Sequence, residues 1–374
     1  MRRILDIDPQ LESKIEATIQ TKGFRDFHHF ATVALENQVA WETGNNETSN
    51  GATSALDSQI NQLNRAIPPS NGSLKAAVTG NENILGMPSQ ESKLPDLSLP
   101  ENANYIFWGQ YYRFLPVKVG VRVLLNMYSE CFPALRDFTE RVTNTALTLR
   151  HRLAKLDRMN RRSFGELLSA SFPTNDEKSV RRFVNQYMLY LRTSDMTLLG
   201  MMPELKLINV TSDENGIARI GLTKFGIKFA LLQNPAIDLD KPESLSGDEI
   251  DFLLNHIADH IPAEYEHMTC ALTAIENGEN TRNELNSVLK EYYSKYHKGT
   301  EWSDTVVNTM RSGLFSRLND LGLVKRKKHG KYVSYQITDS GKRHIQSLSE
   351  KNDVKHITKE YQNQGESIRR VFKQ

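Results

Sequence analysis

Apolar side chains recur at three- and four-residue steps after Ser303, the spacing that places them on one buried face of a helix. This stripe consists of Val307, Met310, Leu314, Leu318 and Leu321. The opposite face of the same helix carries small hydroxyl and amide side chains and no carboxylate. Its members are Thr305, Asn308, Thr309, Ser312, Ser316 and Asn319. The pattern predicts a helix that buries one side and presents a small, polar outer face.

A strongly cationic hairpin is predicted directly after this helix. Leu321-Gly322-Leu323 stops the helix, and a His-Gly turn divides the following run into two short strands. The cations of the run are Lys325, Arg326, Lys327, Lys328 and Lys331. The sequence Ile337-Thr338-x-x-Gly341 then indicates the start of another helix. If the run had no partner, it would simply be a solvated hairpin.

Together, the helix, the Leu-Gly-Leu-Val stop, the basic hairpin and Ile-Thr-x-x-Gly resemble a winged helix-turn-helix over residues 265–348. The resemblance implies a helix in the major groove of DNA and a wing against phosphates or the minor groove. Small hydroxyls and amides can reach base edges there. Candidate base-reading residues are therefore Thr305, Asn308, Thr309 and Ser312. The hairpin cations, with Arg311 and Arg317 on the helix flanks, are candidates for phosphate contact.

The motif at the end of the hairpin has an earlier counterpart. Leu222-Thr223-x-x-Gly226 also follows a hairpin, whose turn is Asp213-Glu214-Asn215-Gly216. We interpret this as an internal repeat and predict a first winged helix over residues 101–240. Its hairpin turn is acidic, and phosphates would repel it. Its candidate DNA-binding surface is instead helical: Lys178, Arg181, Arg182 and Asn185, with Arg150, Arg152 and Arg158 nearby in sequence.

Residues 1–42 are predicted to form a short strand followed by two helices. This order resembles the ribbon-helix-helix family, in which two chains intertwine, so it implies a homodimer through this unit. The outward strand residues would be Arg2, Ile4 and Asp6. They form a poor set for reading DNA because the carboxylate would face phosphates. The unit is therefore expected to serve dimerisation first.

Three further segments connect or extend these units. Residues 43–100 are rich in Gly, Asn, Ser, Thr and Pro, a composition typical of a flexible linker. Residues 241–264 are predicted to form a linking helix, and residues 349–374 a basic tail. The expected fold is mainly α with small β-hairpins: a ribbon-helix-helix-like unit, a linker and two winged-helix domains.

Charge is distributed unevenly along the 374 residues, although the net charge is only +2. The first fifty residues hold five Lys/Arg and eight Asp/Glu, whereas residues 306–374 hold fifteen and six. Such a local excess is typical of a polyanion partner. The two cysteines, Cys131 and Cys270, are far apart, and no apolar run reaches the length of a membrane span. These features favour a cytoplasmic protein without a membrane partner.

Candidate metal and catalytic residues are few. His256, His260, His267 and Cys270 contain ligand types that zinc prefers, but their setting is that of an ordinary helix face. Asp248, Glu249 and Asp251 form an acidic cluster at a helix start, where carboxylates favour the positive end of the dipole. Phosphate-binding, nucleophile-elbow and metalloprotease motifs are missing. We therefore expect no enzyme activity, metal or cofactor.

These patterns lead to one main hypothesis and one alternative. The main hypothesis is a dimeric, prokaryotic-type protein that binds double-stranded DNA through tandem winged helices and acts in transcription regulation. The alternative is a non-catalytic subunit of a larger DNA-handling assembly, such as a plasmid-partition, CRISPR-type or antiphage machine. In that assembly the winged helices would also bind protein partners.

Overall fold

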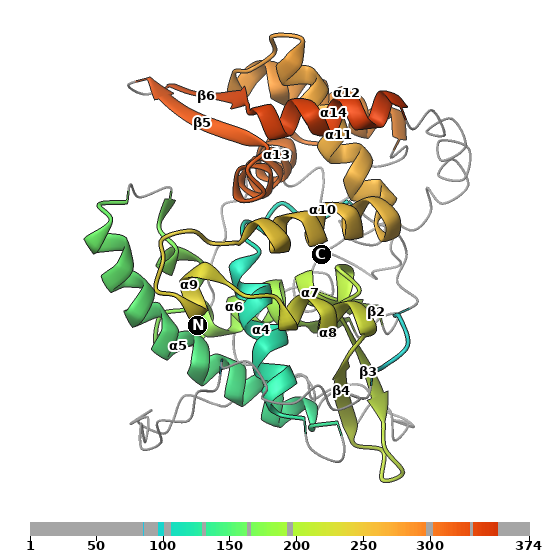
Figure 1. The fold of residues 1–374 in the computed structure, drawn as a ribbon. Helices are drawn as coiled ribbons and strands as arrows, with labels where there is room; N and C mark the ends of the chain where they lie inside the picture. Colours follow the sequence, from blue (N-terminus) through green and yellow to red (C-terminus); the bar gives the residue numbers. More distant parts are fainter. Residues whose placement is uncertain are drawn as a thin grey trace, which may run out of the picture. The chain divides into compact units, whose positions relative to one another are not determined.

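Helices dominate the chain in the computed structural model, which describes residues 85, 96–100, 106–128, 132–162, 166–192, 197–296, 302–329 and 332–350 (Figure 1). Three two-stranded antiparallel sheets accompany the helices in these ranges. The prediction of a mainly α fold with small β-hairpins is confirmed at this level. The elements are α4 (Leu115–Asn126), α5 (Leu135–Met159), η2 (Ser169–Ser171), α6 (Glu177–Phe183), η3 (Val184–Met188), β1 (Tyr190–Arg192), β2 (Thr197–Leu199), α7 (Met201–Glu204), β3 (Ile208–Ser212), β4 (Ala218–Leu222), α8 (Lys224–Leu231), α9 (Pro235–Asp238), α10 (Gly247–His260), α11 (Pro262–Glu276), α12 (Arg282–Tyr296), α13 (Asp304–Asp320), β5 (Val324–His329), β6 (Tyr332–Ile337) and α14 (Asp339–Glu350).

All described residues belong to one of two compact units, residues 55–374; the other unit is 1–54. The ribbon-helix-helix-like unit at 1–42, nearly all of the linker at 43–100 and the tail beyond residue 350 lie outside the described residues. The domain boundaries predicted at 240 and 264 fall inside the second unit. Its buried apolar side chains form one continuous core that runs through both hairpin-bearing halves, residues 106–240 and 247–350.

Helix α13 begins and ends where the sequence predicts. The Ser303 side chain caps its first turn by accepting a hydrogen bond from the Val306 amide. Its end is set by Gly322, whose φ of 70° lies in the left-handed region that glycine enters without strain. The chain then turns into β5, which pairs with β6 from Val324 opposite Ile337 onward.

The two Thr-x-x-Gly motifs have the same hydrogen bonds. In the first, the Thr223 amide donates to the Leu207 carbonyl at 2.9 Å, and Thr223 Oγ1 accepts from the Gly226 amide. In the second, the Thr338 amide donates to the Leu323 carbonyl at 3.0 Å, and Thr338 Oγ1 accepts from the Gly341 amide. A Cβ on Gly226 would overlap the Leu207 carbonyl, and a Cβ on Gly341 would overlap the Leu323 carbonyl. The repeated motif is thus a repeated local structure.

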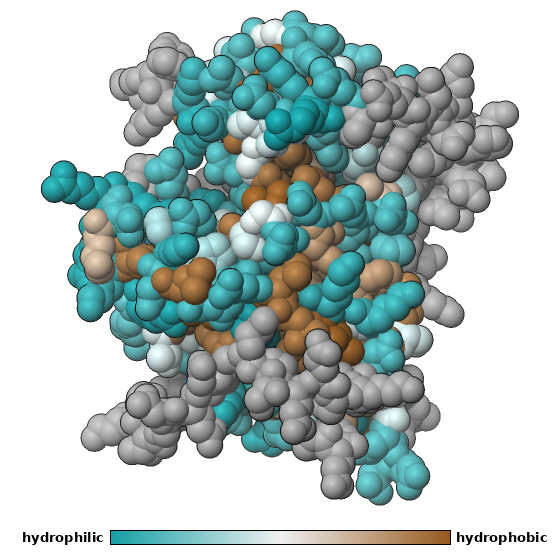
Figure 2. Space-filling model, in the orientation of Figure 1, coloured by the Kyte–Doolittle hydropathy of each residue, from teal (hydrophilic) through white to brown (hydrophobic). Residues whose placement is uncertain are grey.

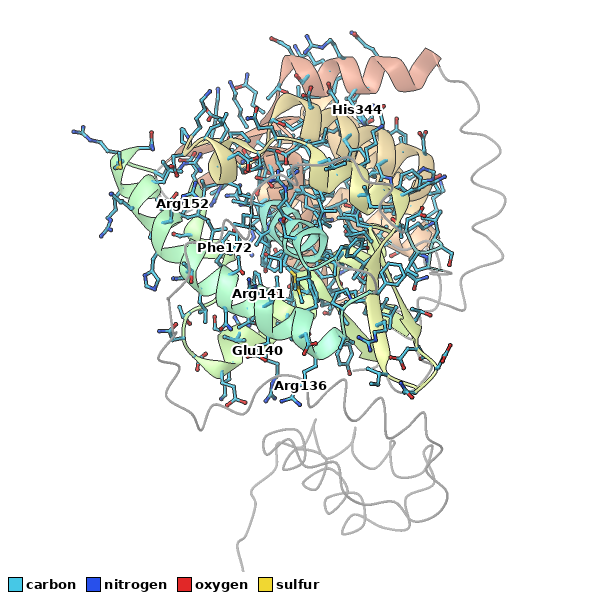
Figure 3. All side chains as sticks on the ribbon, turned by 60° about the horizontal axis from the view of Figure 1, so that its bottom comes forward. Arg136, Glu140, Arg141, Arg152, Phe172 and His344 are labelled. Carbon is cyan, nitrogen blue, oxygen red and sulfur yellow. The ribbon has the colours of Figure 1, made fainter. Side chains whose placement is uncertain are left out.

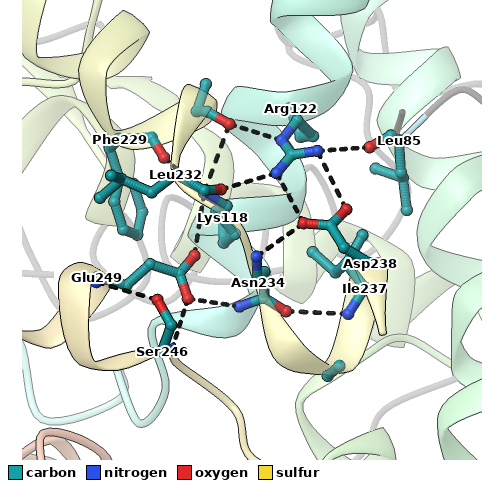
Figure 4. A network of polar contacts seen from close by, with 12 residues as sticks. Leu85, Lys118, Arg122, Phe229, Leu232, Asn234, Ile237, Asp238, Ser246 and Glu249 are labelled. Atoms are coloured by element: carbon teal, nitrogen blue, oxygen red, sulfur yellow. Dashed lines mark hydrogen bonds and ion pairs between the residues drawn. The ribbon is translucent and has the colours of Figure 1, made fainter. Parts of the chain in front are cut away.

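Two cations on α4 fix the first half to the start of α10 (Figure 4). Lys118 Nζ donates to the carbonyls of Phe229 and Leu232 at the end of α8 and lies 3.0 Å from Glu249 Oε1. One turn later, Arg122 binds the Ala230 carbonyl and forms an ion pair with Asp238 at 3.1 Å. Cations at the carboxyl end of a helix complement its dipole. This network therefore joins α4, α8, α9 and α10.

Residues 106–114 connect the first half to α13. The amide of Phe114, at the N-terminus of α4, donates to Asp320 Oδ2 at 2.9 Å. Arg113 forms an ion pair with the same carboxylate at 3.1 Å. The carbonyl of Tyr111 accepts from Arg317 at 2.8 Å. Helix α13 is therefore held at its inner side by a segment about 200 positions away in the sequence.

The helices within the described ranges do not meet the requirements of a membrane span. None of them is both long enough and apolar enough to cross a bilayer.

Candidate nucleic-acid interface

The outward face of α13 is the one that its sequence pattern predicts. All five residues of the apolar stripe are buried. On the other side, Thr305 is exposed, and Asn308, Thr309, Ser312, Ser316 and Asn319 are partly exposed. Two of the hydroxyls donate within the helix, Thr309 to the Thr305 carbonyl and Ser316 to the Ser312 carbonyl. Their oxygens still retain acceptor capacity.

Arg317 does not lie on a helix flank as expected. Its side chain is fully buried and forms an ion pair with Glu264 on α11, with 2.6 Å between Nη2 and Oε1. Burial alone would raise the pKa of Glu264, but Arg317, His267 and the Phe107 amide outweigh it and lower that pKa. An inward guanidinium with these partners has no access to a phosphate. The expectation that Arg317 contacts phosphate is therefore wrong.

Asn308 is anchored by Arg282, a residue outside the predicted set. Its Oδ1 accepts from Arg282 Nε at 3.1 Å, Arg282 Nη2 at 2.9 Å and Asn286 Nδ2 at 2.9 Å. Arg282 is exposed at the start of α12. The Thr281-x-x-Glu284 capping pattern could have located this helix start, because the Glu284 carboxylate accepts from the Thr281 amide. Only the amide nitrogen of Asn308 remains available to a base.

Arg311 also points inward, toward the hairpin. It is 7% exposed and donates to Asn286 Oδ1 at 2.9 Å and to the Tyr335 hydroxyl at 3.1 Å. Tyr335 belongs to β6 and packs on Phe315 of α13, with 4.2 Å between ring centroids. Arg311 thus links α12, α13 and the hairpin, and the expectation that it lies on the helix surface is wrong.

The hairpin presents its cations to solvent. Lys325, Arg326 and Lys327 are exposed on β5, and the residues paired with them are Gln336, Tyr335 and Ser334. None of these partners is a carboxylate, so the positive charge is not neutralised across the strands. The surface over α12–α14 and the hairpin is largely hydrophilic in Figure 2. The side chains of Lys328 and Lys331 lie outside the described residues.

A short extended segment joins this hairpin from the other side. Thr281, just before α12, forms an antiparallel bridge with Ser334, and the Tyr335 amide donates to the Asn280 carbonyl at 3.0 Å. The equivalent bridge in the first half joins Ala134, just before α5, to Arg219 on β4. Each hairpin is therefore extended by one bridge from the residue that precedes a long helix.

The candidate surface of the first half lies on α6 and η3. Lys178, Arg181 and Arg182 are exposed, and Asn185 is partly exposed. Arg181 forms a surface ion pair with Glu177 at 3.0 Å. Lys178 and Arg182 form no ion pair with any described residue, which leaves them the stronger candidates for an anionic partner.

Two of the arginines near this surface stabilise the fold. Arg150 donates to the carbonyls of Ser169 and Phe172, and Arg152 donates to Asp240 Oδ1 at 2.7 Å. Arg158 is exposed near the end of α5. Figure 3 shows Arg136, Arg141 and Arg152 following one another along this helix. Of the three cations assigned to α5, only Arg158 has a side chain that forms no hydrogen bond or ion pair with another described residue.

The acidic turn of the first hairpin is built from local bonds. Asp213 accepts from the amides of Asn215 and Ile217 and forms an ion pair with Arg219 at 2.8 Å. The amide of Ile217, with Arg219, lowers the pKa of this carboxyl. Glu214 is exposed beside it. The turn accordingly offers negative charge and one exposed apolar side chain, that of Ile217.

The candidate metal and acidic clusters have other structural partners. His256 Nε2 is 2.6 Å from the Leu205 carbonyl, and His267 Nε2 is 2.7 Å from the Tyr293 hydroxyl. Burial raises the pKa of the Cys270 thiol to about 11. Within the described ranges, no three His, Cys, Asp or Glu side chains are grouped to hold a metal ion. Glu249 is buried in the capping box of α10, so it points away from the exposed Asp248 and Asp251.

Comparison with known proteins yields no family assignment. No family model matches the chain, and neither a curated protein nor a solved structure resembles it significantly.

Proposed function

We propose that the chain is a DNA-binding protein that contacts double-stranded DNA through α13 and the β5–β6 hairpin. One observation carries this proposal: the outward face of α13 is small and polar, and it adjoins a hairpin whose exposed cations have no carboxylate opposite them. A helix of this kind suits the major groove, and unpaired cations suit the phosphates that flank it.

The residues divide into two roles. Thr305, Thr309 and Ser312 contact base edges, together with the amide nitrogen of Asn308. Lys325, Arg326 and Lys327 contact phosphates and supply the salt-dependent part of the affinity. Lys328 and Lys331 are assigned to phosphate contact from their place in the sequence.

The order of elements in residues 262–350 supports a winged helix. Helix α11, the bridge at Thr281, helices α12 and α13, and strands β5 and β6 follow one another as in that family. The matching Thr-x-x-Gly bonds and the matching bridge at Ala134 support a second winged helix in the first half. There, Lys178, Arg181, Arg182 and Asn185 form a second DNA-binding surface.

The biological role follows from combining these surfaces with the N-terminal unit. Residues 1–42 pair two chains as a ribbon-helix-helix-like dimer, and residues 43–100 let the paired chains reach separated sites. We place this dimer in a prokaryotic cytoplasm as a non-catalytic regulator of transcription.

Chromatin capture with sequencing in the native host tests the proposal. The wild-type chain is expected to enrich discrete sites, and Lys325→Ala/Lys327→Ala is expected to lose that enrichment at equal protein abundance. A wild-type profile identical to an untagged control would contradict DNA binding.

A second function has one observation in its favour. Glu214 is exposed at the first hairpin turn beside Ile217, which is 46% exposed, and this negative charge suits a protein partner better than a phosphate backbone, which would repel it. The chain would then be a non-catalytic subunit of a DNA-handling assembly. A pulldown from the host that recovers a stoichiometric ATPase or nuclease, lost with Ile217→Ser, would favour this function.

A further inference from the structure

Four Lys and Arg side chains are buried in the described part of the chain, and three of them form ion pairs with carboxylates. Lys118 pairs with Glu249, Arg122 with Asp238, and Arg317 with Glu264. Arg311 is the exception. A buried charge without a counterion is costly, so its environment needs an explanation.

Arg311 is surrounded by neutral acceptors and by other cations. Its Nε donates to Asn286 and its Nη1 to Tyr335, whereas Nη2 forms no hydrogen bond with any described residue. Burial lowers the pKa of this guanidinium, Tyr335 opposes that shift, and the nearby charges of Arg282 and Arg326 add to it. Arg282 and Arg326 themselves are exposed and form no ion pair within the described ranges.

The three arginines come from three elements, of which α13 packs against both α12 and β5. Arg282 begins α12, Arg311 lies in α13, and Arg326 lies on β5 opposite Tyr335. Asn286 binds Arg311, and Asn308 binds Arg282, so the amides orient two of the guanidinium groups. The planar guanidinium group presents its donors in a geometry that matches the oxygens of a phosphate.

We propose that Arg282, Arg311 and Arg326 form a phosphate-binding site that takes one backbone phosphate of the bound nucleic acid. The proposal rests on the proposed function for the source of the phosphate. Arg282 and Arg326 contact the phosphate oxygens directly. Arg311 is buried beneath them, adds positive charge to the site and holds the hairpin against α13. The phosphate provides the counterion that no described residue supplies at this site.

Salt titrations of DNA affinity test this site. A labelled mixed-sequence duplex of about 30 base pairs is titrated by fluorescence anisotropy at several KCl concentrations. Because Arg282 and Arg326 contact the same phosphate, Arg282→Gln/Arg326→Gln should reduce the slope of log affinity against log salt by about one rather than two. Each single variant should reduce it by less, because the other arginine still contacts that phosphate. Lys290→Gln is the matched control on α12, since Lys290 is already paired with Asp304 at 2.7 Å.

Inorganic phosphate provides the second arm. It should raise the melting temperature of the wild type and of Lys290→Gln, and have no such effect on Arg282→Gln/Arg326→Gln. If the wild type binds the duplex but Arg282→Gln/Arg326→Gln has an unchanged slope and an unchanged response to phosphate, the site is overturned and DNA binding stands. If the wild type binds no duplex but phosphate protects it through these arginines, the site stands and its ligand is free phosphate. If the response to neither ligand depends on the arginines, the proposal fails.

Discussion

Gly109 and Gly313 are in direct backbone contact, although 204 positions separate them in the sequence. A Cβ on Gly313 would lie 2.6 Å from the carbonyl carbon of Gly109, and a Cβ on Gly109 would lie 2.6 Å from the Met310 amide nitrogen. Real side chains do not approach this closely. The inner side of α13 therefore accepts the 106–114 segment only because both positions lack a side chain.

Gly313→Ala should accordingly destabilise the protein. Alanine normally favours a helix over glycine, but here the methyl group overlaps backbone atoms that cannot move independently. The free energy of unfolding should fall by about 1–3 kcal/mol, measured by urea denaturation. Gly247→Ala is the control, because nothing lies within 4 Å of a Cβ at that position. Equal stability of Gly313→Ala and wild type would contradict the contact.

Replacing one member of the Arg317–Glu264 pair should destabilise the protein more than replacing both members. Arg317→Met or Glu264→Gln leaves one buried group without its partner, and each should lower the unfolding free energy by about 3–5 kcal/mol. The double variant should be clearly less destabilised than the sum of the two. Arg181→Met, which removes a surface pair with Glu177, should change stability by less than about 1 kcal/mol. Strictly additive effects in the double variant would argue against the pair.

Glu204 should make stability depend on pH near neutrality. Burial raises its pKa from 4.5 to about 7 in the folded chain, where it accepts from the Tyr111 hydroxyl and the Gly200 amide. The folded state then binds more protons than the unfolded state between these two values, so stability falls as pH rises through that range. The difference corresponds to about 3 kcal/mol.

Glu204→Gln keeps both acceptor bonds and removes the titration. Its unfolding free energy is measured from pH 4 to pH 8. The difference between the variant and the wild type should grow as pH rises toward 7 and remain constant above it. A wild-type and a variant curve of the same shape would show that Glu204 ionises normally.

The exposed hairpin lysines should govern affinity on every DNA sequence alike. Lys325→Ala/Lys327→Ala is expected to reduce the slope of log affinity against log salt by about two, one for each phosphate that a lysine no longer neutralises. Asn308→Ala, in contrast, should lower affinity by roughly 1–3 kcal/mol more on a preferred site than on random DNA. Binding by the double lysine variant that is indistinguishable from wild type would remove the hairpin from the interface.

Dimerisation is expected to depend on residues 1–42. Deleting them should convert a dimer to a monomer, as measured by light scattering at several concentrations, because the described unit buries its own core. Circular dichroism of the truncated chain checks that this core remains folded. A dimer that survives the deletion would place the interface elsewhere in the chain.

Periodicity predicted the parts of the site that depend on local sequence. The five apolar positions of α13 and the small polar face opposite them follow from the helical repeat alone. The Thr-x-x-Gly similarity predicted a repeated local structure, because its hydrogen bonds involve residues within one hairpin and the following helix start.

Long-range partners account for what the sequence did not reveal. Arg317 resembles a surface cation in its own helix, and long-range partners such as Glu264 and the Tyr111 carbonyl, 53 and 206 positions away, hold it in the core. Arg311 is buried for the same kind of reason, through Tyr335 on a strand that follows the helix. The pattern of a single helix contains no information about such contacts, and Arg282 was missed because its importance depends on Asn308, 26 positions later.

The carboxylate of Asp320 has a consequence for the layout of a binding site. It holds the start of α4 through the Phe114 amide and Arg113, and it accepts at 2.6 Å from the hydroxyl of Ser244, just before α10. The contacts of Asp320 therefore fix how the two halves of one chain, residues 106–240 and 247–350, are oriented toward each other. If each half touches the same duplex, inserting one base pair between their contact points should rotate one of them off its groove. If residues 43–100 form the flexible linker between paired chains that we propose, spacers between the sites of the two chains should tolerate such insertions.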